Sequence, residues 1–225
     1  ESRGLGDVYK RQEEAYIRPF IFLGPEELGL RANNLSTNVG IACWEWPSYM
    51  DPEKKVNGIS IVTSPYNQFE NPLYSNNKII GTYVNSIMAL HDAIERGSDE
   101  ALLLDSNENI SEGSGENLFI VKDEELITPT PDNCLNGITR QSIIKIAQDE
   151  NIDVIEKKLK YDDLVDADEA FFTGTAVEVT PIAKVDETTI GDSMIGPITK
   201  KLQKIFTDTV TNKNKKYAHW LDPIN

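Results

Sequence analysis

The chain has 225 residues, enough to bury a hydrophobic core, and a formal net charge of −15 from 22 Lys and Arg against 37 Asp and Glu. This acidic balance, without a basic cluster, argues against nucleic acid and anionic membrane surfaces as partners. The apolar runs are too short to cross a bilayer, and the chain has two His and two Cys. We therefore expect a cytoplasmic protein with neither a membrane span nor a metal site.

The beginning of the chain predicts a small unit made of strands. Residues 1–12 are basic and glycine-bearing, unlike the acidic remainder, so we interpret them as a leader that is not native to the domain. Residues 16–23 and 39–44 are apolar runs typical of strands. Residues 50–55 are interpreted as part of a connection. We expect residues 13–47 to be the remainder of a small N-terminal domain and residues 48–225 to be a larger domain.

The next segments mix strands and helices. Residues 58–63 predict a strand, and residues 64–77 are polar, contain two Pro and four Asn, and predict a loop that leads to Lys78. Apolar residues recur at helical spacing over residues 84–96, and Gly97 is suited to ending that helix. Residues 101–104 predict a buried strand.

The rest of the chain continues this mixture. Residues 118–122 and 125–128 flank a short turn and predict a hairpin. Residues 139–149 predict an amphipathic helix with Ile143, Ile144, Ile146 and Ala147 on its inner face. Strands are expected at 152–155 and 170–173, and helices at 162–165 and 197–210, the last with Pro in its first turn. Because strands and helices do not alternate strictly, the fold class is α+β or irregular α/β.

Four glycine-containing turns are candidates for binding a ligand. They are KIIGTY (78–83), EGSGEN (112–117), NGITR (136–140) and TGTAVEVTP (173–181). Backbone N–H groups at the start of a helix or strand can hold an anion, and Thr139 and Thr175 add hydroxyl donors. Helix capping alone explains any one of these turns. Four in one chain favour a ligand site.

The order Lys-x-x-Gly-x-Tyr, EGSGENLF, GITR and GTAxEVTP resembles that of the branched-chain amino-acid aminotransferases, which are fold-type IV pyridoxal-phosphate enzymes. The resemblance extends over residues 16–221. It implies a large pseudo-barrel domain that binds the cofactor, next to a smaller α/β domain. It also implies ping-pong transamination of leucine, isoleucine or valine with 2-oxoglutarate, by a homodimer or higher homo-oligomer.

The resemblance assigns roles around the cofactor. Lys78 would form the Schiff base with the cofactor aldehyde and move the α-proton. Glu112 would pair with the pyridine nitrogen and keep it protonated, and Tyr83 would donate to the phenolate oxygen. The phosphate would be held at two turns by the backbone and hydroxyl groups of Gly137, Ile138, Thr139, Gly174 and Thr175.

The resemblance also assigns substrate contacts. The backbone amides of Thr175 and Ala176 would bind the substrate carboxylate. Tyr16, Arg18 and Trp46 match substrate-side positions, and Arg18 could bind the γ-carboxylate of glutamate. Without the family pattern, Arg18 is equally well explained as a surface ion pair.

Simpler interpretations exist for the cofactor residues as well. Lys78 could be a solvated loop lysine, Glu112 a surface carboxylate at a strand end, and Tyr83 a core tyrosine. Family members are longer at the N-terminus and carry there an arginine that clamps the phosphate, so we expect this chain to be a fragment. Ile79 stands where the family prefers a small residue, and residues 64–71 (SPYNQFEN) lack the usual Trp-Arg-Arg-like sequence. The alternatives are a D-amino-acid transaminase, an aminodeoxychorismate-lyase-like enzyme, or a chain that has lost catalysis.

Overall fold

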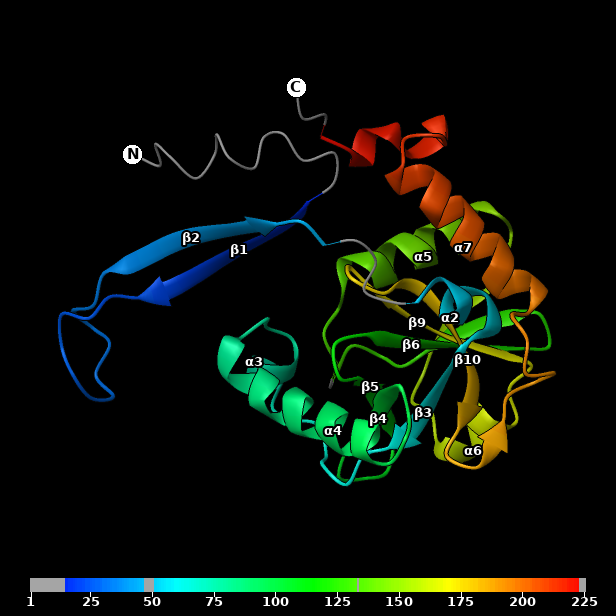
Figure 1. Cartoon of the computed structure of the whole chain (residues 1–225), viewed down its shortest axis with the longest axis horizontal. Helices are drawn as coiled ribbons and strands as arrows, with labels where there is room; N and C mark the ends of the chain where they lie inside the picture. Colours follow the sequence, from blue (N-terminus) through cyan, green and yellow to red (C-terminus); the bar gives the residue numbers. More distant parts are fainter. Residues whose placement is uncertain (1–14, 47–50, 133, 223–225) are drawn as a thin grey trace. The chain divides into compact units, whose positions relative to one another are not determined.

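The computed structural model describes residues 15–46, 51–132 and 134–222, and the chain divides into two compact units, 1–49 and 50–225 (Figure 1). The proposed leader, residues 1–12, lies outside the described residues. The predicted domain limits, 13–47 and 48–225, stay a prediction because their boundary falls within residues 47–50, which are also outside the described part.

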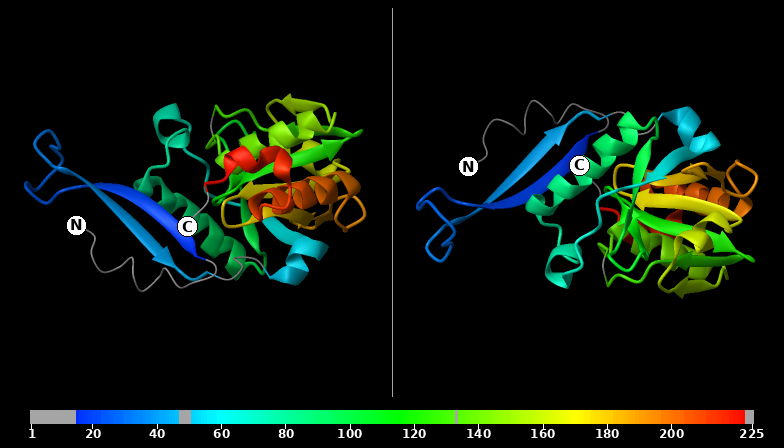
Figure 2. Two further views of the ribbon diagram at one scale, coloured as in Figure 1. Left: turned by 90° about the horizontal axis from the view of Figure 1, so that it is seen from above. Right: turned by 90° about the horizontal axis from the view of Figure 1, so that it is seen from below.

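The N-terminal unit contains an antiparallel hairpin of β1 (Tyr16–Leu23) and β2 (Thr37–Trp44). Figure 2 shows the two strands, in blue, as a twisted ribbon. Both predicted strands are confirmed, although β2 begins two residues before the predicted residue 39. The register pairs Tyr16 with Trp44, which brings together side chains from the two ends of the hairpin sequence.

The C-terminal unit is built on one mixed sheet of nine described strands. These are β3 (Ile59–Thr63), β4 (Glu100–Leu104), β5 (Ile110–Gly113), β6 (Asn117–Lys122), β7 (Glu125–Thr128), β8 (Val154–Glu156), β9 (Glu169–Gly174), β10 (Glu178–Val185) and β11 (Thr188–Thr189). The order is β5-β4-β3-β10-β9-β6-β7-β8, with β11 paired to β10. Three pairs are parallel, β3–β4, β3–β10 and β7–β8, and the rest are antiparallel. This irregular mixture agrees with the predicted fold class.

The helices of this unit include all those predicted and two short ones that were missed. They are α2 (Pro52–Asn57), α3 (Pro72–Ser75), α4 (Tyr83–Glu95), α5 (Ile138–Asp149), α6 (Tyr161–Val165) and α7 (Pro197–Val210), with 3₁₀ turns η1 (Ile80–Thr82) and η2 (Lys215–Trp220). None of the described helices is long and apolar enough to cross a membrane.

The two missed helices have the same start signal. We expected a connection at 50–55 and a loop at 64–77, and both expectations are wrong where α2 and α3 form. The Asp51 side chain accepts a hydrogen bond from the backbone N–H of Glu53, and the Asn71 side chain accepts one from the backbone N–H of Leu73. In both helices the capping residue is followed directly by Pro. Asp or Asn followed by Pro is a helix start because the side chain caps the first turn and Pro fits its geometry.

The core follows from the alternation of side chains along the strands. Leu118 and Ile120 of β6 join one apolar cluster, whereas Phe119 and Val121 join a second cluster on the opposite face. The second cluster lies under α5 and α7, which Figure 1 shows together on one face of the sheet. The predicted inner face of α5 is confirmed, because Ile143, Ile146 and Ala147 are fully buried and Ile144 packs against the same cluster.

Helix α4 is confirmed as a helix, but its buried face differs from the one that its large apolar residues suggest. Ala89 and Ala93 are buried against Val62, Ala101 and Leu103 of β3 and β4. In contrast, Ile87 is 66% exposed and Ile94 is 58% exposed. Small side chains let the helix approach the sheet closely, and the large ones therefore point away from it.

A pair of Ile→Ala substitutions tests this core. Ile143→Ala should lower the free energy of unfolding by about 2–5 kcal/mol, because it leaves a cavity under α5. Ile94→Ala, the matched control, should change it by no more than about 0.5 kcal/mol. Urea unfolding of both variants measures the difference. Equal losses would contradict the assignment of α5 to the core.

Candidate active site

Three of the four glycine-containing turns meet at one end of the sheet. Asn117 in β6 is paired with Thr173 in β9. A Cβ atom on Gly174 would lie 3.5 Å from the Gly115 carbonyl oxygen, and a Cβ atom on Gly137 would lie 2.4 Å from Asn117 Oδ1. Gly137 therefore has no room for a side chain. The glycines bring EGSGEN, NGITR and TGTA into contact, which explains their occurrence at these turns.

The fourth turn places Lys78 and Tyr83 in a pocket next to the EGSGEN segment. Lys78 precedes η1, and its Nζ donates a hydrogen bond to the Tyr83 hydroxyl at the start of α4 and lies 5.1 Å from the ring centroid. Both residues line a pocket together with Glu112, Asn117 and other residues of the same loops. The pocket has a volume of about 50 Å³.

Glu112 is buried in this pocket among neutral donors. It lies in β5, opposite Leu103 of β4, and not in a loop. Its Oε1 accepts from Gln68 Nε2 at 2.5 Å, and its Oε2 accepts from the Leu135 N–H at 3.2 Å and from Asn117 Nδ2 at 3.4 Å. Burial raises the pKa of Glu112 to about 7, although these hydrogen bonds and the charge of Lys78 oppose the rise. This carboxyl group can therefore change its protonation state near neutral pH.

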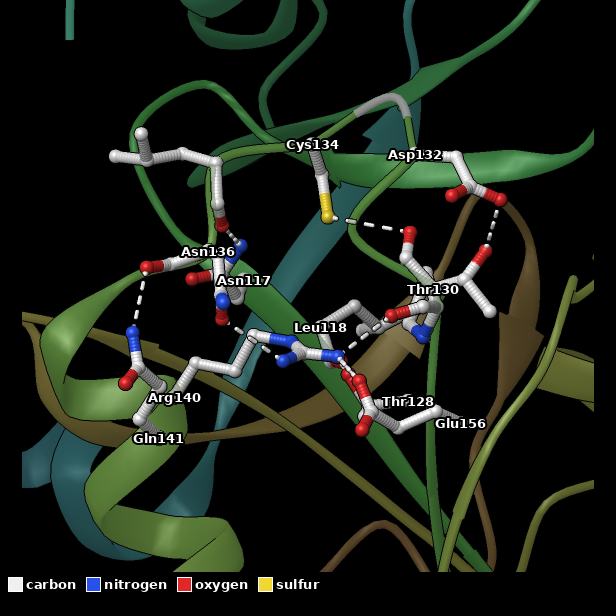
Figure 3. A network of polar contacts seen from close by, with 12 residues as sticks. Asn117, Leu118, Thr128, Thr130, Asp132, Cys134, Asn136, Arg140, Gln141 and Glu156 are labelled. Carbon is white, nitrogen blue, oxygen red and sulfur yellow. Dashed lines mark hydrogen bonds and ion pairs between the residues drawn. The ribbon is translucent and has the colours of Figure 1, made fainter. Parts of the chain in front are cut away.

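The loop between β7 and α5 connects Glu112 to the start of α5. Leu135 donates its N–H to Glu112 and accepts from Asn117 Nδ2 at 2.7 Å through its carbonyl oxygen. Arg140, which is fully buried in α5, holds the loop at both ends. It donates to the Asn136 side chain at 3.1 Å and to the Pro129 carbonyl at 2.9 Å, and it also pairs with Glu156 (Figure 3).

The start of α5 supplies donors for an anion. Gly137 is the N-cap and makes no side-chain capping bond, so the N–H groups of Ile138 and Thr139 have no partner within the helix. Ile138 is 83% exposed, while Thr139 is buried. Thr175 is exposed in the turn between β9 and β10, next to Ala176. The predicted phosphate donors thus come from the two turns whose glycines contact the EGSGEN segment.

The predicted substrate-side residues lie in the N-terminal unit and form an aromatic cluster there. The Tyr16 ring centroid lies 4.7 Å from that of Trp46 and 5.0 Å from that of Trp44. The Arg18 guanidinium lies 5.4 Å from the ring centroids of both Tyr16 and Trp44, within the range of a cation–π contact. Trp44 was not among the predicted residues.

Sequence reasoning also missed the partners of Glu112. Gln68 lies in a segment interpreted only as a polar loop, and no signal in the sequence singles it out. Asn117 does carry a signal, because it follows closely on the two glycines of EGSGEN. Its position between Glu112, Leu135 and Gly137 is visible only in the structure.

A larger cavity, of about 490 Å³, lies between the start of α5, the end of α7 and η2. Its lining consists of Ile138, Gln141, Ser142, Thr209, Val210, Trp220 and Leu221. These residues offer neither an amine nor a carboxylate for catalysis. We therefore place the candidate active site at the smaller Lys78–Glu112 pocket.

Comparison with known proteins decides the family. The chain is 46% identical to the branched-chain-amino-acid aminotransferase of Pseudomonas aeruginosa over 209 residues, which are 92% of this chain and 68% of that relative. The profile of the family described as Amino-transferase class IV matches residues 5–185. The chain belongs to the class IV aminotransferases. Within them it groups with the branched-chain enzymes, as the motifs predicted.

Solved structures of this family support the fold. The T.th. branched-chain amino acid aminotransferase with pyridoxamine 5′-phosphate matches with a TM-score of 0.90 and 38% identity, over 94% of this chain and 70% of that one. The same enzyme complexed with N-(5′-phosphopyridoxyl)-L-glutamate matches with a TM-score of 0.87 and 38% identity, over 94% and 69%. These matches confirm the predicted fold-type IV architecture. The roles of single residues stay predictions.

The buried Glu112 predicts a pH-dependent stability. Its pKa is about 7 in the folded chain against an ordinary 4.5, so its contribution to stability is complete below about pH 4.5 and is lost as the pH rises to about 7. The loss should approach about 1.4 kcal/mol per pH unit. Glu112→Gln should remove this loss, whereas the exposed Glu125→Gln should not. Urea unfolding at a series of pH values tests this, and parallel curves for the parent and Glu112→Gln would contradict the raised pKa.

Proposed function

We propose that this chain transfers the amino group of leucine, isoleucine or valine to 2-oxoglutarate, with pyridoxal phosphate as cofactor. The observation that carries this proposal is one pocket with an amine, a phenol and a buried carboxyl group whose pKa is near neutral: Lys78, Tyr83 and Glu112. The cofactor agrees with the pyridoxamine and phosphopyridoxyl groups named for the T.th. enzyme.

The residues present fit this cofactor. Glu112 would hold a proton on the ring nitrogen, which requires a buried carboxyl group rather than a solvated one. Tyr83 would donate to the phenolate oxygen. The N–H groups of Ile138 and Thr139, the Thr175 turn and the positive end of the α5 dipole would hold the phosphate, with Gly137 and Gly174 allowing the backbone to come close.

When bound, the cofactor supplies the aldehyde that takes up the amino group and the ring that accepts electrons. Lys78 would anchor it through Nζ and then move the proton of the substrate Cα atom, because the same amine is released at that moment. Its contact with Tyr83 sets the position of this amine. The amides of Thr175 and Ala176 would orient the substrate by its carboxylate.

The second substrate needs a site for its extra carboxylate. Arg18 is the candidate, because its guanidinium is exposed and lies against Tyr16 and Trp44. Tyr16 and Trp46 would contact the aliphatic side chains of the first substrate, since the same aromatic cluster offers apolar surface. We further propose that the chain acts as a homodimer or higher homo-oligomer, which analytical ultracentrifugation tests.

Product assays separate this function from its alternatives. Leucine-dependent formation of glutamate from 2-oxoglutarate supports a branched-chain aminotransferase. Activity on D-amino acids would indicate a D-amino-acid transaminase, and pyruvate release without a keto acid acceptor would indicate a lyase. A chain that binds the cofactor but forms none of these products would be non-catalytic.

Lys78 is predicted to be the anchoring and proton-transferring residue. Borohydride treatment of the cofactor-loaded protein, followed by peptide mapping, should label Lys78. Lys78→Ala should lower amino-group transfer from leucine by about a hundredfold or more, because general base catalysis is lost. The exposed Lys145→Ala is the matched control. A label on another lysine, or full activity of Lys78→Ala, would refute the assignment.

Arg18 is predicted to discriminate between the two substrates. Arg18→Gln should raise the KM for 2-oxoglutarate by about ten- to a hundredfold, because a charge-assisted hydrogen bond is lost, while the reaction with leucine changes little. Arg31→Gln, an exposed arginine of the same unit, should change neither. Steady-state kinetics with each substrate varied separately gives the comparison. An equal effect on both substrates would contradict this role.

A further inference from the structure

Two buried carboxyl groups that the proposed function does not use flank the Gly113–Gly115 turn. Glu100 is the first residue of β4 and is 1% exposed, and Glu116 directly precedes β6 and is 7% exposed. Strands β4 and β5 are neighbours, with Leu102 opposite Gly113. The two carboxyl groups therefore approach the same turn from two elements.

Both groups hold the backbone of this turn. Glu100 Oε1 accepts from the N–H of Ala101 at 2.7 Å and from that of Ser114 at 3.3 Å. Glu116 Oε2 accepts from the Gly115 N–H at 2.9 Å, and the Glu116 carbonyl accepts from the Gly113 N–H at 2.7 Å. The turn that follows Glu112 is thus fixed from both sides.

One oxygen is left without a donor. Glu100 Oε2 is buried and has no hydrogen-bond partner among the described residues, and the Glu100 carboxyl group lies within hydrogen-bonding range of the Glu116 carboxyl group and of the Ser114 side chain. Neither carboxyl group forms an ion pair with a described Lys, Arg or His. A buried oxygen without a donor is costly, and so are two buried negative charges side by side.

The surroundings offer no other charge to resolve this conflict among the described residues. The titratable group that faces the pair is Glu112, itself acidic, and Lys78 acts on Glu112. In the β9–β10 turn, a Cβ atom added to Gly174 would lie 3.6 Å from Glu116 Cγ, so this turn brings an uncharged residue close to Glu116. A proton on Glu116 would satisfy Glu100 Oε2 and would remove one of the two buried charges.

We propose that Glu100 and Glu116 form a carboxyl pair that shares one proton, and that this pair positions the Gly113–Gly115 turn and Glu112. Glu116 carries the proton and donates a hydrogen bond to Glu100. Burial raises the pKa of Glu100 too, but the N–H groups of Ala101 and Ser114 bind its other oxygen and oppose that rise, so Glu100 is the partner that stays ionised. Burial, followed by the nearby charge of Glu100, raises the pKa of Glu116 well above its ordinary range.

The pair responds to the charge of Glu112. An ionised Glu112 raises the pKa of Glu116 further, because like charges disfavour a third charge. If Glu112 pairs with the protonated cofactor ring, which rests on the proposed function, the positive charge of the ring offsets that of Glu112, so the effect of Glu112 on Glu116 is strongest in the chain without cofactor. Glu100 and Glu116 are then positioning residues, which act through Glu112 and the turn without touching the substrate.

The number of protons that the whole chain releases on unfolding can be measured without cofactor, so this test does not depend on the proposed function. Between about pH 6 and pH 8 the unfolded chain has released this proton and the folded chain has kept it, so rising pH favours unfolding. The unfolding constant of the parent should rise about tenfold more per pH unit than that of Glu116→Gln. The glutamine keeps the hydrogen bond to Glu100 through its amide but carries no proton to lose.

Controls make the result specific. Glu125→Gln, an exposed glutamate, should keep the slope of the parent. Glu116→Leu, which cannot donate to Glu100, should be less stable than Glu116→Gln, and if it fails to fold the glutamine comparison still decides. Equal slopes for the parent and Glu116→Gln would overturn the proposal, as would a slope difference of about a hundredfold per pH unit, which means two protons.

A titration of single groups tests the positioning role. Carbon-13 NMR of labelled glutamate side chains follows Glu116 in the parent and in Glu112→Gln. The loss of the neighbouring charge should lower the proton affinity of Glu116 by roughly tenfold. A residue that merely fills space would show no such coupling. An unchanged titration of Glu116 in Glu112→Gln would refute the link between the pair and Glu112.

Discussion

The close approach of three backbone turns around Asn117 is the constraint on which the candidate site depends. The side chain of Asn117 bridges two turns, since its amide nitrogen donates to the Leu135 carbonyl and its oxygen occupies the space that a Cβ on Gly137 would need. The same nitrogen reaches Glu112. One polar side chain thus fixes the spacing between the carboxyl group at the centre of the pocket and the helix end that offers its N–H groups to an anion. The sheet supplies the rigid frame, because Asn117 is paired with Thr173 in β9.

The pocket combines burial with neutral hydrogen-bond donors, and this combination determines the acid–base behaviour of Glu112. An adjacent arginine would hold such a carboxyl group ionised at all pH values of interest. Gln68, Asn117 and the Leu135 N–H are weaker partners, so burial outweighs them and the pKa rises to about 7. The stability of the rest of the fold offsets the cost of burying this group without an ion pair. Functional sites commonly contain such locally unfavourable arrangements.

Patterns that act locally could be predicted from the sequence, and those that depend on tertiary contacts could not. The strand β1 and the helix α7 agree with their predicted limits because turn residues and a leading proline mark them. Helix α4 was predicted from the spacing of its apolar residues, yet the sheet selects Ala89 and Ala93 because only small side chains fit there. The four motifs predicted the pocket residues through a resemblance. Gln68 and Glu100 have no local signal, because what distinguishes them is a neighbour more than ten residues away.

Leu135 contributes to the site through its backbone, and this has a consequence for how the chain can vary. Its N–H binds Glu112 and its carbonyl binds Asn117, while its side chain takes no part in either bond. Many amino acids at this position would preserve both bonds, since every residue except proline carries the same donor and acceptor. Asn117 has no such freedom, because its side chain makes the contacts. Two neighbours in one network therefore face opposite evolutionary constraints, and a comparison of natural sequences would show variety at 135, without proline, beside near-invariance at 117.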